Sequence, residues 1–233
     1  LINLIEMAIN RSKVDGKKEI SQDLVKKILT DKARRFDKGG DQFYDQISAL
    51  HKSVRGSDPD ASLYWFFRML DGGADPLYLA RRIVRIAVED IGLADPRAQT
   101  MALEAYQIYE RLGHPEGELA LSNAVIYLAM AAKSNSAYVA YNDVKAFIKH
   151  QNHHDVPIHL RNAPTKLMND LNYGKEYRYA HNEPNGYAAG EKYFPDELDS
   201  VKFFKPTERG LEKKISEKQE FLESLDKEYK KRK

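Results

Sequence analysis

The chain has 233 residues, of which 37 are lysine or arginine and 35 are aspartate or glutamate, so its formal net charge is only +2. This balance argues against a protein that coats nucleic acid and against an acidic tail protein. The absence of cysteine excludes disulfide frameworks, thiolate zinc sites and cysteine nucleophiles. Hydrophobic residues make up 42% of the chain, which is enough to bury a core. The longest apolar stretch is about half of the ~18–20 residues that a membrane span requires.

Helix signals begin at the N-terminus. Residues 1–9 and 21–29 have the apolar spacing of two short helices, and residues 37–40 have the composition of a linker. Asp41 is a candidate N-cap for a further helix, because its side chain can accept a backbone hydrogen bond, and Gly56 is a matching stop.

Three Asp-Pro pairs mark the next helices. Aspartate is a good N-cap, and proline suits the first helical position because its missing N–H is not needed there. Each pair is followed by an apolar-periodic run that ends at glycine, which predicts helices over residues 59–71, 76–91 and 96–112. Short connections favour antiparallel packing of these helices. Residues 119–132 are apolar on nearly every face, which predicts a central buried helix, and Asn135 is a candidate cap for the next one.

The character of the chain changes over residues 152–206, where prolines and glycines alternate with many tyrosines and phenylalanines. This segment is too aromatic for a disordered linker, so we expect an ordered loop packed on the bundle. It should hold a short helix over residues 163–171 and a small hairpin around residues 183–186. From residue 207 a charged helix follows. The predicted fold is therefore an all-α antiparallel helical bundle with a long ordered aromatic loop and a C-terminal charged helix.

The sequence contains no nucleotide-binding motif. The Gly-Lys pair nearest to a phosphate loop is Gly16-Lys17, but Lys18 follows it and Arg11 occupies the place of the first glycine. The HExxH, GxSxG and GxGxxG motifs are also absent. We therefore predict no catalytic residue and no cofactor-binding residue in this chain.

Four histidines, His150, His153, His154 and His159, lie close together, and imidazole is a common metal ligand. Zinc sites usually need ligand pairs on a defined scaffold, or a carboxylate or cysteine partner, whereas this segment crosses Pro157 and is irregular. We interpret the four as surface or loop-packing histidines and predict no metal site.

Basic residues gather in two places. With 3.6 residues per turn, Arg81, Arg82, Arg85 and Glu89 share one arc of about 100° on an otherwise apolar helix. This arc could make internal or intersubunit ion pairs, or it could contact phosphate; the apolar character of the helix favours ion pairs.

The second place is the aromatic loop. Lys166, Lys175, Tyr177 and Arg178 could combine base stacking with backbone-charge contacts, as in proteins that bind single-stranded nucleic acid. Aromatic residues in an ordered loop more often anchor that loop, and the sequence leaves both interpretations open.

Several strings of residues together resemble a known family. They are DKGGD at 37–41, SALHKSVRGSDPDA at 48–61, DPLYLARR at 75–82, EDIGLADP at 89–96, KSN at 133–135, PIHLRNAPTKLM at 157–168 and YRYAH at 177–181. Essentially the whole chain resembles the C-terminal half of the replication-associated recombination protein A family, which includes the bacterial MgsA/RarA proteins and the eukaryotic Werner-helicase-interacting ATPase.

The resemblance implies a parent protein of the clamp-loader clade of AAA+ ATPases, cytoplasmic and nucleoid-associated, that acts at stalled or gapped replication forks. It implies a homotetramer formed through the helical C-terminal region and a link to DNA and the single-stranded-DNA-binding protein, with no membrane partner. The family's ATP and magnesium sites would lie upstream of residue 1. Residues 1–36 would be the end of the AAA+ lid. Residues 37–233 would be the collar-like helical oligomerisation domain, including the loop 152–206 and the terminal helix 207–233.

Two functions follow as hypotheses. The first is a non-catalytic tetramerisation module that buries apolar helix faces between subunits, at about 25 cal/mol per Å². Trp65, Phe66 and Phe67 are candidates for that interface, because one helix cannot turn three consecutive aromatic side chains inward. The alternative is a module that binds single-stranded or gapped DNA through the arginine helix or the aromatic loop. The nearly neutral charge favours the first.

Overall fold

The computed structural model describes residue 22 and residues 41–232. Within this part of the chain every regular element is helical, with eight α-helices and no strand, which confirms the predicted all-α fold. The helices expected over residues 1–9 and 21–29 and the linker expected at 37–40 lie outside the described residues, apart from the helical residue 22. No described helix is both long enough and apolar enough to span a membrane.

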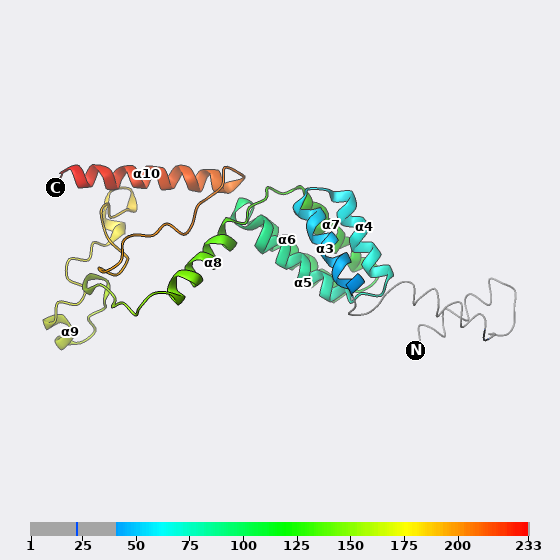
Figure 1. Cartoon of the computed structure of the whole chain (residues 1–233), viewed down its shortest axis with the longest axis horizontal. Coiled ribbons are helices and arrows are strands. Elements are labelled where there is room, and N and C mark those ends of the chain that lie inside the picture. Colours follow the sequence, from blue (N-terminus) through cyan, green and yellow to red (C-terminus); the bar gives the residue numbers. More distant parts are fainter. Residues whose placement is uncertain (1–21, 23–40, 233) are drawn as a thin grey trace. The chain divides into compact units, whose positions relative to one another are not determined.

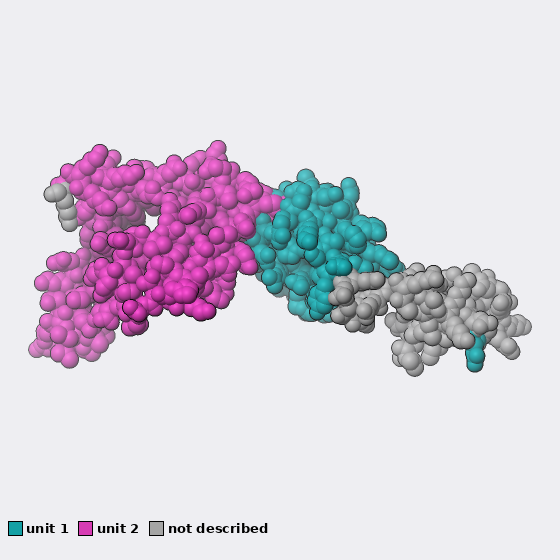
Figure 2. All heavy atoms as spheres, in the orientation of Figure 1, with its two compact units in different colours: residues 1–90, 97–131 teal, residues 91–96, 132–233 magenta. Residues whose placement is uncertain are grey.

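The described residues form two compact units, which Figure 2 colours separately. Unit 1 contains residues 41–90 and 97–131, and unit 2 contains residues 91–96 and 132–232. The chain therefore enters unit 2 for six residues, returns to complete unit 1, and then enters unit 2 again.

Aspartate caps start two helices of unit 1. Asp58 accepts a hydrogen bond from the Ala61 N–H at 2.9 Å, and Asp75 accepts from the Leu77 and Tyr78 N–H groups at 3.0 and 3.2 Å. These bonds confirm the predicted caps. The elements of unit 1 are α3 (Asp41–Arg55), α4 (Pro59–Asp71), α5 (Pro76–Ile86), the π-helix η1 (Ala87–Ile91), whose last residue begins unit 2, α6 (Arg97–Leu112) and α7 (Glu116–Met130) (Figure 1).

Helix α7 is the central helix of unit 1, as predicted, because it contacts α3, α4, α5 and α6. Its Leu121 and Leu128 side chains are fully buried. The expected burial of this helix is incomplete, since Leu119, Ile126 and Met130 are exposed. These three residues are called the α7 stripe below.

The consecutive aromatic residues of α4 divide between the inside and the outside. Phe66 is fully buried in the core of unit 1, whereas Phe67 is exposed and Trp65 is half-buried. The helix does not turn all three inward, as its geometry requires. Of the three interface candidates, Trp65 and Phe67 keep side-chain surface for a partner, and Phe66 keeps none.

Unit 2 is organised around a short segment that precedes α6. The 3-10 turn η2 (Gly92–Ala94) contacts both α8 (Ser136–Lys149) and α10 (Leu211–Arg232). The shorter elements between these two helices are η3 (Ile158–Leu160), α9 (Lys166–Asp170), η4 (Ala180–Asn182) and η5 (Pro184–Gly186). The predicted short helix and terminal helix are thus present, each beginning a few residues later than expected.

A buried carboxylate joins the starts of α8 and α10. Glu212 is fully buried, and it accepts hydrogen bonds from the Ser136 hydroxyl at 2.6 Å and the Thr207 N–H at 2.7 Å. Burial alone would raise the pKa of Glu212, but these hydrogen bonds outweigh it and the pKa lies below its ordinary value. Asn135 precedes α8 as predicted but makes no side-chain cap bond; Ser134 accepts the Ser136 N–H instead.

The hairpin expected at residues 183–186 is wrong. The turn is present as η5, with Asn185 at φ 61°, but no strand flanks it in the described chain. The loop also bonds to α10: Asp226 accepts the Tyr187 hydroxyl at 2.9 Å and the Gly190 N–H at 2.8 Å. Burial and the neighbouring carboxylate raise the pKa of Tyr187 to about 12.

Candidate functional site

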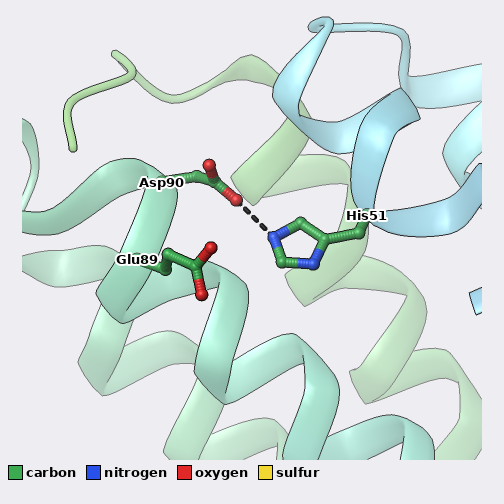
Figure 3. A group of neighbouring side chains, drawn as sticks. All are labelled: His51, Glu89 and Asp90. Atoms are coloured by element: carbon green, nitrogen blue, oxygen red, sulfur yellow. Dashed lines mark hydrogen bonds and ion pairs between the residues drawn. The ribbon is translucent and has the colours of Figure 1, made fainter. Parts of the chain in front are cut away.

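Helix α3 binds two carboxylates that follow α5. His51 and Arg55 lie four residues apart on α3 and therefore share one face. The His51 Nε2 donates to Asp90 Oδ2 at 2.5 Å, and the Arg55 Nε donates to Asp90 Oδ1 at 2.7 Å. Glu89 lies beside them, 3.7 Å from the Arg55 guanidinium, and Figure 3 shows Glu89, Asp90 and His51 around one point. Both carboxylates belong to the π-helix η1, a geometry frequent at functional sites.

Asp90 and Arg55 each favour the charged form of the other. Burial alone would raise the pKa of Asp90, but the hydrogen bonds from His51 and Arg55 outweigh it, and the pKa lies below its ordinary value. The hydrogen bond to Asp90 raises the pKa of Arg55. Because an ionised carboxylate only accepts, Nε2 of His51 carries a hydrogen.

The same cluster has the composition of a metal site, since His51, Glu89 and Asp90 place one ligand atom each within 4.8 Å of the others. However, a metal ligand needs a bare imidazole nitrogen, whereas Nε2 of His51 donates to Asp90. The Arg55 guanidinium already supplies the positive charge at 2.7 Å. The geometry is therefore that of an ion-pair network in which the Arg55 guanidinium occupies the position that a metal ion would take.

Glu89 connects this network to the arginines of α5. Its carboxylate lies 3.7 Å from Arg55 Nη2 and 2.9 Å from Arg85 Nε. Arg81 and Arg82 lie on the same arc of α5 as Arg85. The structure thus joins Arg55 of α3 to the three arginines predicted from the sequence, and we call Arg55, Arg81, Arg82 and Arg85 the arginine face.

Tyr78 orders the N-terminal half of the arginine face. Its ring lies 5.9 Å from the Arg81 guanidinium carbon and 5.5 Å from that of Arg82, and its hydroxyl accepts from Arg82 Nε at 3.1 Å. Arg81 also lies 3.7 Å from Asp75. In the described part of the chain no carboxylate contacts Arg82. The predicted internal ion pairs are thus present for Arg81 and Arg85 but not for Arg82.

Among the four candidate contact residues of the aromatic loop, Arg178 is bonded within the protein. All three guanidinium nitrogens of Arg178 are bonded within unit 2: Nε and Nη2 donate to Glu183 at 3.1 and 2.7 Å, and Nη1 donates to the Ala189 carbonyl at 2.7 Å. The Arg178 guanidinium carbon also lies 5.0 Å from the Tyr229 ring. Arg178 therefore anchors the loop to α10, and it lines an open pocket of about 260 Å³ there.

The other loop candidates face solvent. Lys166, Lys175 and Tyr177 are exposed. Within the described residues the four histidines of the sequence cluster do not form a group that could hold a metal ion. The His159 Nε2 donates to the Lys192 carbonyl of the loop at 2.8 Å, because a carbonyl oxygen can only accept.

His51, Arg55 and Asp90 were missed by motif analysis. All three lie in strings that carry the family resemblance, and His51 and Arg55 have the i,i+4 spacing of one helix face. That spacing is the available signal, but the partner carboxylate lies 35 residues from Arg55, so only tertiary structure pairs them.

Comparison with known proteins first defines a class: residues 1–55 match the AAA C-terminal domain. A more specific match follows, because residues 56–223 match the C-terminal region of the MgsA AAA+ ATPases. The chain therefore belongs to the MgsA AAA+ ATPase C-terminal family, as the sequence resemblance predicted. The two matches meet between residues 55 and 56; the domain boundary expected after residue 36 stays a prediction.

Relatives in bacteria and in a eukaryote are similar along most of the chain. Replication-associated recombination protein A of Coxiella burnetii is 54% identical over 230 residues, which is 98% of this chain and 52% of the relative. The protein of the same name in Escherichia coli K12 is 51% identical over 227 residues, 97% of this chain and 51% of the relative. ATPase WRNIP1 of Dictyostelium discoideum is 42% identical over 220 residues, 87% of this chain and 25% of the relative. The chain spans about half the length of these bacterial relatives.

Proposed function

We propose that the chain is the subunit-joining module of an AAA+ ATPase that works in DNA replication and recombination, and that it assembles as a homotetramer. Family membership and the names of the relatives support the cellular setting. ATP hydrolysis would belong to the part of the protein that carries a phosphate loop, a motif this sequence lacks.

The observation that carries the proposal is the α7 stripe. The side chains of Leu119, Ile126 and Met130 are 68%, 39% and 64% exposed, although they lie on the helix that contacts the four other α-helices of unit 1. With 3.6 residues per turn, positions 119, 126 and 130 fall within an arc of about 40°, so they share one face of α7, on which the exposed Asn123 also lies. Covering a leucine or methionine side chain contributes about 1.5–3 kcal/mol, so covering the α7 stripe in an assembly is favourable.

Other helices expose apolar side chains too. Tyr64 and Phe67 of α4 are exposed and lie three residues apart on one face. Tyr141 and Ile148 of α8 are also exposed. Several such faces suit a tetramer better than a dimer, because a tetramer with dihedral symmetry uses more than one kind of interface.

Light scattering tests the proposal. At micromolar concentration the chain is expected to be a tetramer, and the variant Leu119→Asp/Met130→Asp is expected to dissociate, because assembly would bury two carboxylates in an apolar contact. The control Thr100→Asp/Gln107→Asp adds the same charges at exposed polar positions of α6 and should stay tetrameric. A monomeric wild-type chain would refute the joining role, and ATP turnover by the purified chain would refute its non-catalytic character.

A further inference from the structure

We propose that the arginine face binds the phosphates of a nucleic-acid backbone. This inference goes beyond subunit joining, and it takes only the replication setting from the proposed function. It starts from the charge that the face presents to solvent. The Arg55, Arg81 and Arg85 side chains are 51%, 57% and 58% exposed, whereas Glu89 and Asp90 are 18% and 6% exposed. Glu89 and Asp90 thus lie beneath the guanidinium groups of Arg55 and Arg85, whose positive ends face outward, whereas Asp75, the partner of Arg81, is 58% exposed.

Three of the guanidinium groups are held in place through their Nε atoms. Arg55, Arg82 and Arg85 each donate from Nε, to Asp90, to the Tyr78 hydroxyl and to Glu89 respectively.

For Arg82 and Arg85 this leaves the two Nη groups without a hydrogen bond in the described part of the molecule. A guanidinium anchored through Nε is fixed in orientation, and its Nη donors can bind two oxygens of one phosphate. Arg178 is the contrast, because all three of its guanidinium nitrogens are already bonded.

The arginine face carries more positive than negative charge. Four arginines form the face, and three carboxylates contact them, those of Asp75, Glu89 and Asp90. Arg82 is the arginine in excess, since its neighbours are the hydroxyl and the ring of Tyr78. A polyanion would therefore meet an uncompensated positive charge at one edge of the arc.

The spacing of the arginines suits a polymer. Arg81 and Arg85 lie four residues apart, so their backbones are separated by about 6 Å along α5. A nucleic-acid strand offers a charge about every 3.4 Å of helix axis, so neighbouring phosphates of one strand can meet both guanidinium groups. Contacts of this kind position a strand without reading its sequence.

Binding of a fluorescein-labelled oligothymidylate and of a duplex of equal length, followed by anisotropy, tests the proposal on the whole 233-residue chain. Wild-type chain should bind, with an affinity that falls as salt rises. Arg82→Ala/Arg85→Ala should weaken binding about tenfold and reduce the slope of log K against log salt by about 2, one for each lost phosphate contact. Both side chains have solvent-accessible surface, so the helical content of the variant should not change.

Two further variants separate positioning from charge. Tyr78→Phe keeps the ring and the charge but removes the acceptor of Arg82 Nε, so affinity should fall about twofold to threefold with an unchanged salt slope. Arg68→Ala/Arg111→Ala removes two positive charges from other helices of unit 1 and should leave affinity within about twofold of wild type.

Absence of DNA binding by the wild-type chain, or an equal loss in both double variants, would overturn the proposal. An Arg82→Ala/Arg85→Ala variant that binds DNA normally but changes its assembly state would assign the face to a protein contact instead. Light scattering on the same samples measures the assembly state separately from DNA binding. A monomeric chain that still binds DNA through this face would contradict the tetramer proposal and would support the phosphate site.

Discussion

Asp90 makes a contribution to the stability of the fold whose size depends on pH. Its pKa in the folded chain is below the ordinary value, despite burial, because His51 and Arg55 bond to the ionised form. The ionised form therefore stabilises the fold fully above the unfolded pKa of about 3.9, and this contribution is lost as pH falls through the lower folded pKa. We predict that Asp90→Asn lowers the free energy of unfolding at pH 7 by about 1.5–3 kcal/mol.

Urea unfolding at neutral pH and below about pH 4 measures this. The wild-type advantage over Asp90→Asn should shrink in acid. Glu110→Gln, at an exposed position of α6, is the control and should change the unfolding free energy by less than about 0.5 kcal/mol at either pH. An Asp90→Asn variant as stable as wild type at pH 7 would show that the network is not stabilising.

The sequence predicted which residues share a helix face better than it predicted the partner of each side chain. The arc of Arg81, Arg82 and Arg85 follows from helical spacing alone, and the structure preserves it. What spacing cannot supply is the partner of each side chain. Arg178 looked like the arginines of α5 in sequence, yet Glu183 and Ala189 occupy all of its nitrogens. Such assignments depend on the tertiary fold.

At the scale of elements, the start of α10 depends on a close approach. Gly210 has φ 55°, and a Cβ there would overlap the Ala94 carbonyl oxygen of η2. We predict that Gly210→Ala loosens the docking of α10, seen as faster hydrogen exchange along that helix. Gly186→Ala is the matched control in unit 2, because Gly186 has φ 63° with nothing within 4 Å of the added methyl.

The control should show only the cost of a left-handed residue, about 1–2 kcal/mol, with normal exchange in α10. Equal exchange in the two variants would mean that the contact between Gly210 and Ala94 does not hold α10.

Local chemistry determined most helix boundaries, and tertiary contacts determined the exceptions. The Asp-Pro caps started α4 and α5 at the predicted residues. The π-helix η1 was not foreseen, because its carboxylates are bound by side chains from α3. The expected hairpin failed for a similar reason, since Asp226 of α10 binds the loop at Tyr187 and Gly190.

At the scale of the whole molecule, a short segment of unit 2 interrupts the chain of unit 1. Residues 91–96 belong to unit 2 although residues of unit 1 precede and follow them. We predict that a fragment of residues 41–131 unfolds cooperatively by heat, whereas a fragment of residues 132–233 does not. The second fragment lacks η2, on which α8 and α10 pack.

Circular dichroism of each fragment and of their mixture is the measurement. Mixing the two fragments should restore cooperativity to unit 2, because the first fragment supplies η2. A sharp thermal transition in the isolated 132–233 fragment would contradict this dependence.

The excursion of residues 91–96 also constrains how such a module can be inherited. A single genetic crossover at any position between residues 41 and 232 leaves at least one unit without part of its own chain. No single crossover in this range can therefore exchange one unit with another gene and leave the other unit intact. The family match over residues 56–223 runs across both units, as expected if they are passed on together.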